Sequence, residues 1–377
     1  MRTGIATMTL DYGRCPRWLF ERMTRLGRVI ALAIISELGS AEFIRRLADP
    51  VWFQSLGTLM AFDWNASGLT VVTTAALKEA LKGLERDADV FICGGKGKTS
   101  RKTPEQIRAW SFVIGHSQTL SDRLIYTSKA AAKVDSALIQ DGFNLYHHIF
   151  VFNKKGKWAV VQQGMNTTIS RARRYHWLGE SVQNLLEEPH SGIATQAKLE
   201  TVLDLTSKKS ENNKETTLAL VKDEKSLYRS LRILAEPKGN RQLKILDLPG
   251  IEFQHHPVEG EFLHPQLRKT VEKVVVSQPN SFERLLMIPG VGGRTIRALT
   301  LVSEVIYGAK PSYEDPARYS FAYGGKDGTP YPVDRETYDR TLSILENAVR
   351  KSNLWLKEKE ETLRKIEGMS KRIFGSM

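Results

Sequence analysis

The fold class is decided by the stretch Tyr146-His147-His148-Ile149-Phe150-Val151-Phe152-Asn153-Lys154-Lys155-Gly156-Lys157-Trp158-Ala159-Val160-Val161-Gln162-Gln163. Two runs within it, 146–152 and 158–163, are rich in β-branched and aromatic residues, and a short segment with Lys and Gly separates them. This pattern predicts a β-hairpin. Because side chains alternate along a strand, His148 is expected on one face with Tyr146 and Phe150, and His147 on the other with Ile149. Gln162 and Gln163 are expected on opposite faces of the second strand.

Helical patterns surround this hairpin. Apolar residues at helical spacing follow Pro16, and Gly39 is expected as the C-cap of that helix. The segment Thr103-Pro104-Glu105-Gln106 predicts a helix start, with Thr103 as N-cap and Gln106 completing a capping box. The other expected elements are a helix at 42–47, a compact turn at 59–68, helices at 72–84, 104–113, 128–140 and 216–235, a buried strand at 90–93, and a largely helical chain from Pro265.

Together these patterns predict an α+β fold, in which a mixed N-terminal domain with a β-hairpin-containing sheet precedes a mainly helical C-terminal domain. The composition changes after about residue 195, where the chain becomes polar and mixed in charge. We therefore expect an α+β domain at 1–195, a charged helical segment and connector at 196–264, and a helical domain at 265–377.

The composition is that of a globular protein with a polyanionic partner. The chain has 377 residues, of which 41% are hydrophobic and 26% charged, and its formal net charge is +13. Nucleic acid is the first candidate partner and an anionic membrane surface the second. Two cysteines, Cys15 and Cys93, build neither a disulfide framework nor a four-thiolate zinc site, so a reducing cytoplasm is expected. The longest apolar stretch near the N-terminus, 29–35, is too short to span a bilayer.

Residues 285–299, Leu-Leu-Met-Ile-Pro-Gly-Val-Gly-Gly-Arg-Thr-Ile-Arg-Ala-Leu, resemble the helix-hairpin-helix motif of DNA-binding proteins. Gly290 and Gly292 tolerate positive φ and leave no Cβ between peptide N–H groups and a phosphate. Those N–H groups open a second helix, where the helix dipole favours an anion. Arg294 and Thr295 follow in its first turn. The motif predicts sequence-independent contact with a nucleic-acid backbone, although a tight turn between two packed helices would give the same pattern.

A second basic segment, Gly94 to Lys102, precedes the predicted helix start at Thr103. It ends like a Walker A loop, but Ile92 stands where the first Gly of that motif is required, so a nucleotide triphosphatase is not expected. A Gly-rich cationic loop still suits a backbone phosphate, and a solvated charged loop is the alternative. The cations expected to neutralise phosphates are Lys96, Lys98, Arg101, Lys102, Arg173 and Arg174.

The densest group of polar side chains lies between residues 129 and 176. The residues that we expect to surround a scissile phosphodiester are Asp135, Asp141, His147, His148, Gln162 and Gln163. A restriction-type nuclease core requires an acid and a Lys where Gln162 and Gln163 stand, and a phospholipase-D-like site requires His-x-Lys where Phe150 follows His148. Neither template is met, so a nuclease here would be divergent, with Mg²⁺ or Mn²⁺ as the metal. Each of these side chains also has a structural interpretation, in which it satisfies buried backbone groups.

Two further patterns remain open. His255, His256 and His264 suggest a metal site, but no Cys or well-placed carboxylate completes a zinc set, so exposed histidines in a connector are the preferred interpretation. Asp315 follows the hairpin motif at about the spacing of the catalytic Asp in helix-hairpin-helix glycosylases. Arg294 stands where bifunctional members carry Lys, and it stays protonated, so only a monofunctional reaction is compatible with the sequence.

Several long motifs resemble the family called domain of unknown function 763. They are Arg2-Thr3-Gly4-Ile5-Ala6, Trp18 to Met23, Gly94 to Glu105, and His147-His148 with Val161 to Asn166. The resemblance extends over most of the chain and groups these segments as one unit. It implies no particular reaction.

From the residues we expect a cytoplasmic DNA-binding protein of repair or recombination, with a metal-dependent nuclease activity as the working hypothesis. The alternatives are a non-catalytic DNA- or RNA-binding protein and a monofunctional DNA glycosylase acting through Asp315. The partner is expected to be nucleic acid and not a membrane, and the sequence leaves the oligomeric state open.

Overall fold

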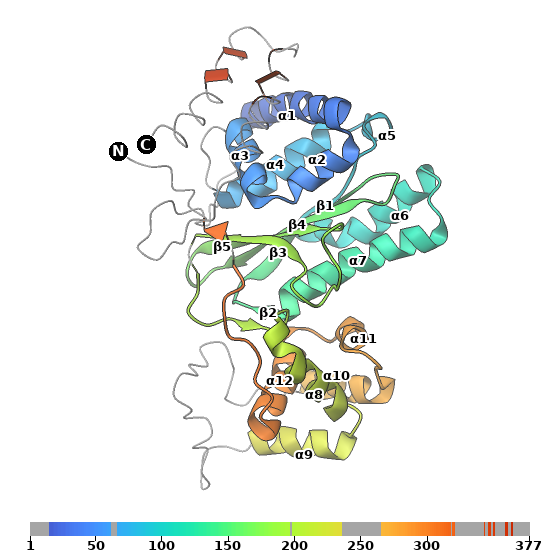
Figure 1. The fold of residues 1–377 in the computed structure, drawn as a ribbon, viewed down its shortest axis with the longest axis vertical. Coiled ribbons are helices and arrows are strands. Elements are labelled where there is room, and N and C mark those ends of the chain that lie inside the picture. The colour runs from blue at the N-terminus through green and yellow to red at the C-terminus, as the bar shows by residue number, and fades with distance from the viewer. Residues whose placement is uncertain are drawn as a thin grey trace.

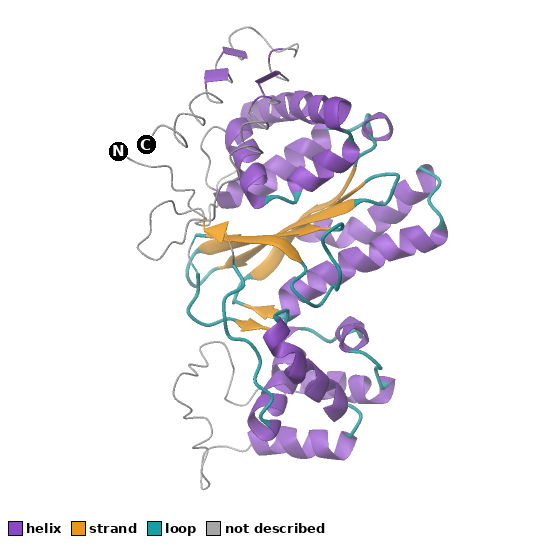
Figure 2. Ribbon diagram, in the orientation of Figure 1, coloured by secondary structure: helices purple, strands orange, loops and turns teal. Residues whose placement is uncertain are grey.

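In the computed structural model, a sheet lies between two helical layers, and a further group of helices extends beyond one of them (Figure 1). The structure describes residues 15–61, 66–196, 198–235, 265–317 and 319–320, with scattered positions between 343 and 364. The N-terminal part contains both helices and strands, and the described C-terminal part is mainly helical (Figure 2). The predicted α+β fold is thus confirmed.

The sheet has six strands in the order β1-β3-β4-β5-β6-β8. All neighbours are antiparallel except β6 and β8, which are parallel. Their bounds are β1 Phe91–Lys96, β3 Asn144–Phe152, β4 Trp158–Asn166, β5 Arg171–Leu178, β6 His190–Thr195 and β8 Tyr319–Ser320. The predicted hairpin is β3–β4, with His148 opposite Gln162 and His147 opposite Gln163. The strands β5 and β6 were not predicted.

One face of the sheet is covered by the N-terminal helices. These are α1 Arg17–Leu38, α2 Ser40–Leu47, α3 Pro50–Ala61 and α4 Ala66–Ala80, followed by the short α5 Glu85–Ala88. The apolar stripe of α1, from Leu19 to Ile34, is buried as predicted, and Gly39 ends the helix at φ +87°. The compact turn predicted at 59–68 is wrong at both ends, because α3 continues to Ala61 and α4 begins at Ala66. Residues 62–65 lie outside the described part of the chain.

The other face is covered by α6 Thr103–Val113 and α7 Gln118–Ala137, which follow the 3₁₀ turn η1 Gly97–Lys102. The predicted capping box at Thr103 is wrong. The Thr103 hydroxyl donates to the Ser100 carbonyl, and the Gln106 side chain accepts from the Gly94 N–H and from Lys78 Nζ, both at 2.9 Å. Gln106 therefore ties α6 to β1 and to α4 instead of closing the first turn of its own helix.

The remaining helices form a group next to the lower end of α7. They are α8 Glu211–Leu220, α9 Glu224–Ala235, α10 Pro265–Ser277, α11 Phe282–Met287 and α12 Gly293–Tyr307. The helices α8 and α9 pack against α12, so the helices of the predicted middle segment belong to the same layer as those of the C-terminal segment. The apolar core under α6 and α7 continues into this group without a break.

Two short connections join the helical group to the sheet. The strands β2 Ile139–Gln140 and β7 Leu203–Asp204 pair with each other, and η2 Lys208–Ser210 leads into α8. After α12 the chain returns to the sheet, where Ser312 bridges to Asp204 and β8 pairs with β6 (Figure 1). The strand β8 is thus built into the N-terminal sheet.

Candidate functional site

One half of the sheet is polar on both faces. Within strands β3, β4 and β5, the residues at one end are polar and buried, and those at the other end are apolar. The register aligns His147, Gln163 and Arg174 on the α4 side, and His148, Gln162 and Tyr175 on the α7 side. Burying a polar group costs free energy unless a partner satisfies it. The partners of these two rows therefore define the candidate site.

On the α7 side, a chain of hydrogen bonds runs from Ser128 to Asp135. The distance from Ser128 Oγ to His148 Nε2 is 2.8 Å, and His148 Nδ1 lies 2.8 Å from Gln162 Oε1. Gln162 Nε2 donates to Asp135 Oδ2 at 2.5 Å. Because the Gln162 amide nitrogen faces the carboxylate, its oxygen must accept from His148 Nδ1–H. His148 Nε2 is then the acceptor of the Ser128 hydroxyl proton.

This chain ends in the Asp135 carboxylate, which has two further partners. Besides Gln162, Asp135 accepts from Trp177 Nε1 at 3.1 Å and lies 2.6 Å from His190 Nε2. Burial lowers the pKa of His148, while Gln162 and Asp135 oppose that shift. With the exposed fraction of Asp135 at 0% and that of Ser128 at 2%, neither side chain reaches solvent. The arrangement resembles a nucleophile–base pair in its hydrogen bonding, but it is closed on all sides.

On the α4 side, a β-bulge changes the predicted alternation. The register of β3 against β4 shifts between Leu145 and His147, and Tyr146 therefore lies on the face of Gln163. From the sequence, Tyr146 had been predicted on the opposite face, with His148. Gln163 Nε2 donates to the Tyr146 hydroxyl and, at 2.8 Å, to the Ser67 carbonyl at the start of α4. Lys96 Nζ lies 5.9 Å from the centre of the Tyr146 ring. Bulges are common beside functional sites because they redirect single side chains.

His147 is held in one tautomer on this face. The Thr74 hydroxyl donates to the Thr70 carbonyl at 2.9 Å, so its oxygen accepts from His147 Nε2–H, also at 2.9 Å. His147 Nδ1 is consequently unprotonated, and it has no partner among the described residues. Burial lowers the pKa of His147 to about 3, and the neighbouring His148 and Lys96 add to the shift. The imidazole is therefore neutral at physiological pH.

Arg174 completes the α4-side row. Its guanidinium donates to Thr70 Oγ1 at 3.0 Å, to Gln54 Oε1 at 3.1 Å and to His176 Nε2 at 2.8 Å. It also lies over the Phe53 ring, 4.7 Å from the ring centre. Burial lowers the pKa of Arg174 to about 9. At 0% exposure this side chain is part of the core and is not placed to neutralise a phosphate, contrary to the prediction.

A third network surrounds Arg173. This guanidinium contacts Asp141 at 3.0 Å and Asp315 at 2.7 Å, and all three side chains are at most 2% exposed. Tyr175 donates its hydroxyl proton to Asp141 at 2.6 Å. Burial raises the pKa of Asp141, although Arg173 acts in the opposite direction. Arg173 is therefore a structural ion-pair partner, and its predicted phosphate contact does not fit its position.

Asp315 is fully engaged in this network. Its two oxygens accept from Arg173, from the Leu199 N–H at 2.7 Å and from the Ala317 N–H at 2.9 Å. A carboxylate with four such donors is not placed to activate water, so the geometry does not favour the glycosylase alternative. The contacts instead hold the returning segment before β8 against the sheet.

The six side chains expected around a scissile group are thus divided among separate networks. Asp135, His148 and Gln162 share the α7 side, His147 and Gln163 lie on the opposite face, and Asp141 pairs with Arg173. Within the described part of the chain, no group of three or more His, Cys, Asp or Glu side chains is arranged to hold a metal ion. His255, His256 and His264 lie outside the described residues. The geometry provides no single cleft that unites the predicted nuclease residues.

Exposed cations gather at the end of β1. Lys96, Lys98, Arg101 and Lys102 are all exposed, on the strand end or on the 3₁₀ turn. Within β1, before this turn, Gly94 has φ +99° and its backbone approaches β3 closely, since a Cβ at Gly94 would lie 2.1 Å from the His148 carbonyl oxygen. Within the described residues, no ion pair joins Lys98, Arg101 or Lys102 to an acid. These charges remain available to an external anion.

The predicted hairpin at 285–299 consists of α11, a turn at 288–292 and α12. Gly290 has φ +98°, as the prediction requires, whereas Gly292 is extended and does not need to be glycine for its backbone angles. Gly292 is the N-cap of α12, and no side chain caps this end. Arg294 is exposed, but Thr295 is buried at 3% and does not present its hydroxyl to a ligand, contrary to the prediction.

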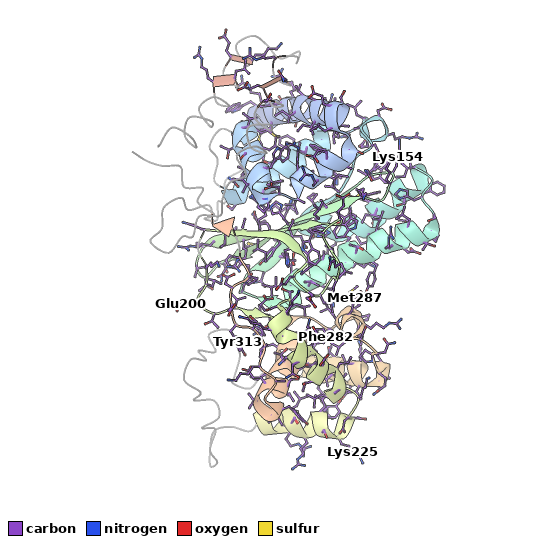
Figure 3. The ribbon with its side chains drawn as sticks, in the orientation of Figure 1. Lys154, Glu200, Lys225, Phe282, Met287 and Tyr313 are labelled. Atoms are coloured by element: carbon purple, nitrogen blue, oxygen red, sulfur yellow. The ribbon has the colours of Figure 1, made fainter. Side chains whose placement is uncertain are left out.

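The turn of this hairpin is fixed to α7. Lys133 Nζ donates to the Val291 carbonyl, and Gln140, just after α7, donates to the Gly293 carbonyl at 2.9 Å. Arg297 Nε donates to Gln140 Oε1 at 2.5 Å. These bonds use carbonyl oxygens and side chains. Among the residues that the structure describes, none accepts from the N–H groups of residues 293–295 at the start of α12. Figure 3 shows Phe282 and Met287, at the two ends of α11, close to the lower end of α7.

Several residues of these networks were not identified from the sequence. Ser128, Thr74, Ser67 and His190 are single polar residues whose partners are far away in the chain, and only the fold brings them to the strands. Tyr146 was predicted on the wrong face because a bulge gives no signal in the alternation of apolar residues. The long-range contacts could not have been inferred from local pattern.

The structure defines an α+β protein whose mainly antiparallel sheet has a polar half and whose C-terminal helices include α11 and α12, joined by a short turn. Residues 4–333 match the family described as "Protein of unknown function (DUF763)", and the chain belongs to this family. No curated protein and no solved structure matches this chain. Among the described helices, none has the length and apolar character needed to cross a membrane.

Proposed function

We propose that this protein binds DNA through the start of α12 and the adjoining face of α7. The observation that carries the proposal is the uncapped N-terminus of α12, which lies beside the exposed Arg294. The first N–H groups of a helix have no intrahelical partner, and the helix dipole makes their surroundings positive. An anion such as a backbone phosphate satisfies both conditions.

The neighbouring face of α7 adds charge to this end. Lys129 is exposed and Lys133 half-buried, and they lie one turn apart on α7. Lys133 contacts the hairpin itself, so the cations of α7 and the N–H groups of α12 belong to one surface. Contacts of this kind neutralise phosphates and do not read base edges, so the proposed binding is independent of sequence.

The exposed cations of the 3₁₀ turn and the net charge of +13 support a polyanionic partner. The proposal is limited to binding, because the residues expected to cleave a phosphodiester do not converge. Sequence-independent binding is compatible with a role in repair or recombination. No feature of the surface requires such a role.

The proposal is tested by measuring the affinity for a labelled duplex over a range of salt concentrations. For the wild type we expect log K to fall linearly with log salt. Arg294→Gln removes one phosphate contact and should lower the slope by about 1 and weaken binding several-fold at low salt. Lys225→Gln is the matched control, since Lys225 is an exposed cation on α9, far from the hairpin (Figure 3).

A second variant tests the helix N-terminus without removing charge. A Cβ added at Gly292 meets no atom within 4 Å in the free protein, so Gly292→Val is expected to fold. The branched side chain would stand between the N–H groups and a phosphate and should weaken binding. If Arg294→Gln and Gly292→Val bind duplex as well as Lys225→Gln does, the proposed surface is wrong. The same DNA incubated with Mg²⁺ or Mn²⁺ should remain uncleaved.

A further inference from the structure

Phe112 on α6 has a largely exposed aromatic ring. Its exposed fraction is 88%, the highest among the large hydrophobic side chains of the described residues. It lies in the last turn of α6, next to Val113, which is 45% exposed. Exposing a whole aromatic ring to water is unfavourable, and a ligand that stacks on it would remove this cost.

The end of α6 that carries Phe112 is firmly anchored. On the opposite side of the helix, the Trp110 ring packs against Phe91 at 5.1 Å, and Phe91 packs against Phe152 at 5.3 Å. His116 Nε2 lies 2.9 Å from the Lys154 carbonyl, which joins the α6–α7 loop to the tip of the β3–β4 hairpin. Phe112 is therefore presented on a rigid support, as a stacking platform requires.

Charged residues of both signs lie around Phe112, and the cations include one on the same face of α6. Arg108 lies one turn before it on the same face of α6, and Lys155 is exposed at the adjacent hairpin tip. Lys154, labelled in Figure 3, is exposed at the same tip, and its Nζ donates to the Arg86 carbonyl at 2.9 Å. The acids of this region are Glu105 on α6, Asp122 on α7 and Asp89 at the hairpin tip. Asp122 accepts from Gln118, and Asp89 accepts from the Lys154 N–H. At the other end of α6, roughly 16 Å away for an eleven-residue helix, are the cations of the 3₁₀ turn.

We propose that α6 and the 3₁₀ turn before it bind single-stranded nucleic acid, with one base stacked on Phe112 and the backbone following Arg108 toward Arg101 and Lys102. An exposed ring beside a row of cations fits a strand whose bases are unpaired, because each base offers a face to stack on. Duplex DNA keeps its bases stacked internally and would use only the cations. The inference rests on the proposed nucleic-acid binding and specifies a second, separate surface for it.

The test compares a labelled oligothymidylate with a duplex of equal length, using fluorescence anisotropy and the full chain. Stacking on an aromatic side chain is worth about 1–3 kcal/mol per base, so Phe112→Ala should weaken oligothymidylate binding by about five-fold to 150-fold and leave duplex binding unchanged. Phe112→Tyr keeps the ring and should retain the affinity. Val276→Ala is the matched control, because Val276 is 83% exposed on α10 and has no role in the proposal.

The outcomes separate this inference from the proposed function. If the duplex is bound and Arg294→Gln weakens it, while Phe112→Ala binds oligothymidylate like the wild type, the single-strand surface is wrong and the proposed function stands. If Phe112→Ala instead changes only the self-association of the protein, measured by sedimentation, the exposed ring is a protein contact and the inference is again overturned. If neither DNA is bound, both proposals fail.

Discussion

The buried histidines of the polar half-sheet predict a steep loss of stability between pH 7 and pH 5. Burial lowers the pKa of His147 from 6.5 to about 3, and it lowers the pKa of His176 well below the same reference value. The folded protein keeps both rings neutral, whereas the unfolded chain binds a proton on each of them below pH 6.5. The stability that depends on these neutral rings is therefore present above pH 6.5 and is lost as the pH falls toward the folded pKa.

The magnitude follows from linkage. At pH 5, the unfolded state gains about 2 kcal/mol for each histidine that titrates near 6.5 when unfolded and stays neutral when folded. His147 and His176 together should then lower the free energy of unfolding by about 4 kcal/mol between pH 7 and pH 5. His148 adds to this in the same direction, since burial lowers its pKa too. A loss of this size is a large part of the stability of an ordinary domain.

The assay is urea denaturation of the wild type and of His147→Gln at pH 7 and pH 5. His147→Gln removes one titrating group, so the difference between the two pH values should shrink by about 2 kcal/mol, whatever the variant costs at pH 7. Gln163→Met is the matched control, because Gln163 is the direct neighbour of His147 on β4 and has no titrating group. It should lower stability equally at both pH values. An unchanged pH difference in His147→Gln would show that this ring is not held neutral, and the assignment of its tautomer would then be wrong.

Other consequences concern the ion pairs and the glycines. Arg173→Met leaves Asp141 and Asp315 buried without their cation, so it should lower the free energy of unfolding, measured by urea denaturation, by about 3–5 kcal/mol. Asp315→Asn should lower it by less, because Arg173 still pairs with Asp141. Equal losses in the two variants would contradict this ranking. Gly290→Ala should lower the free energy of unfolding by about 1–2 kcal/mol, because the φ of Gly290 is +98°. Gly292→Ala should change the free energy of unfolding by less than about 0.5 kcal/mol, and urea denaturation of both variants measures the difference. Gly94→Ala places a Cβ 2.1 Å from the His148 carbonyl oxygen and should separate β1 from β3. The β1 amides should then exchange hydrogen faster than in the wild type, and unchanged slow exchange would refute this prediction.

The pairing within the hairpin could be predicted from sequence because it depends on local pattern. Two runs with β-strand composition and a short turn determine that β3 and β4 pair, and this pairing brings His148 opposite Gln162. The bulge at Tyr146 could not be predicted in the same way, since it is stabilised by Gln163 and by the packing of α4. Local alternation continues through a bulge unchanged in the sequence, although the side chains change faces.

The two buried arginines show the same limit more clearly. Arg173 and Arg174 were expected to neutralise phosphates, which requires an exposed position, and charged side chains are indeed mostly exposed. Their partners are distant in the chain: Arg173 pairs with Asp315, 142 positions away, and Arg174 donates to Gln54, 120 positions away. Composition and periodicity give no signal for such contacts. By contrast, the exposed Arg294 and the cations of the 3₁₀ turn follow glycines in short turns, where local sequence is enough to predict exposure.

Helix α7 connects the polar half-sheet with the proposed DNA-binding hairpin. Its sheet-facing side carries Ser128 and Asp135, which are bonded to His148 and Gln162. Its other side carries Tyr126 and Lys133, which bond to Glu283 of α11 and to the turn before α12.

These two sets of contacts fix the rotation and the position of α7 at the same time, because residues three to four positions apart face the same way on a helix and the two sets lie on opposite faces. The buried networks therefore have a consequence beyond stability. They hold the uncapped start of α12 in a fixed place relative to α6 and its exposed Phe112. A nucleic acid that contacts both surfaces would meet a preformed arrangement and would not have to order it, which favours affinity.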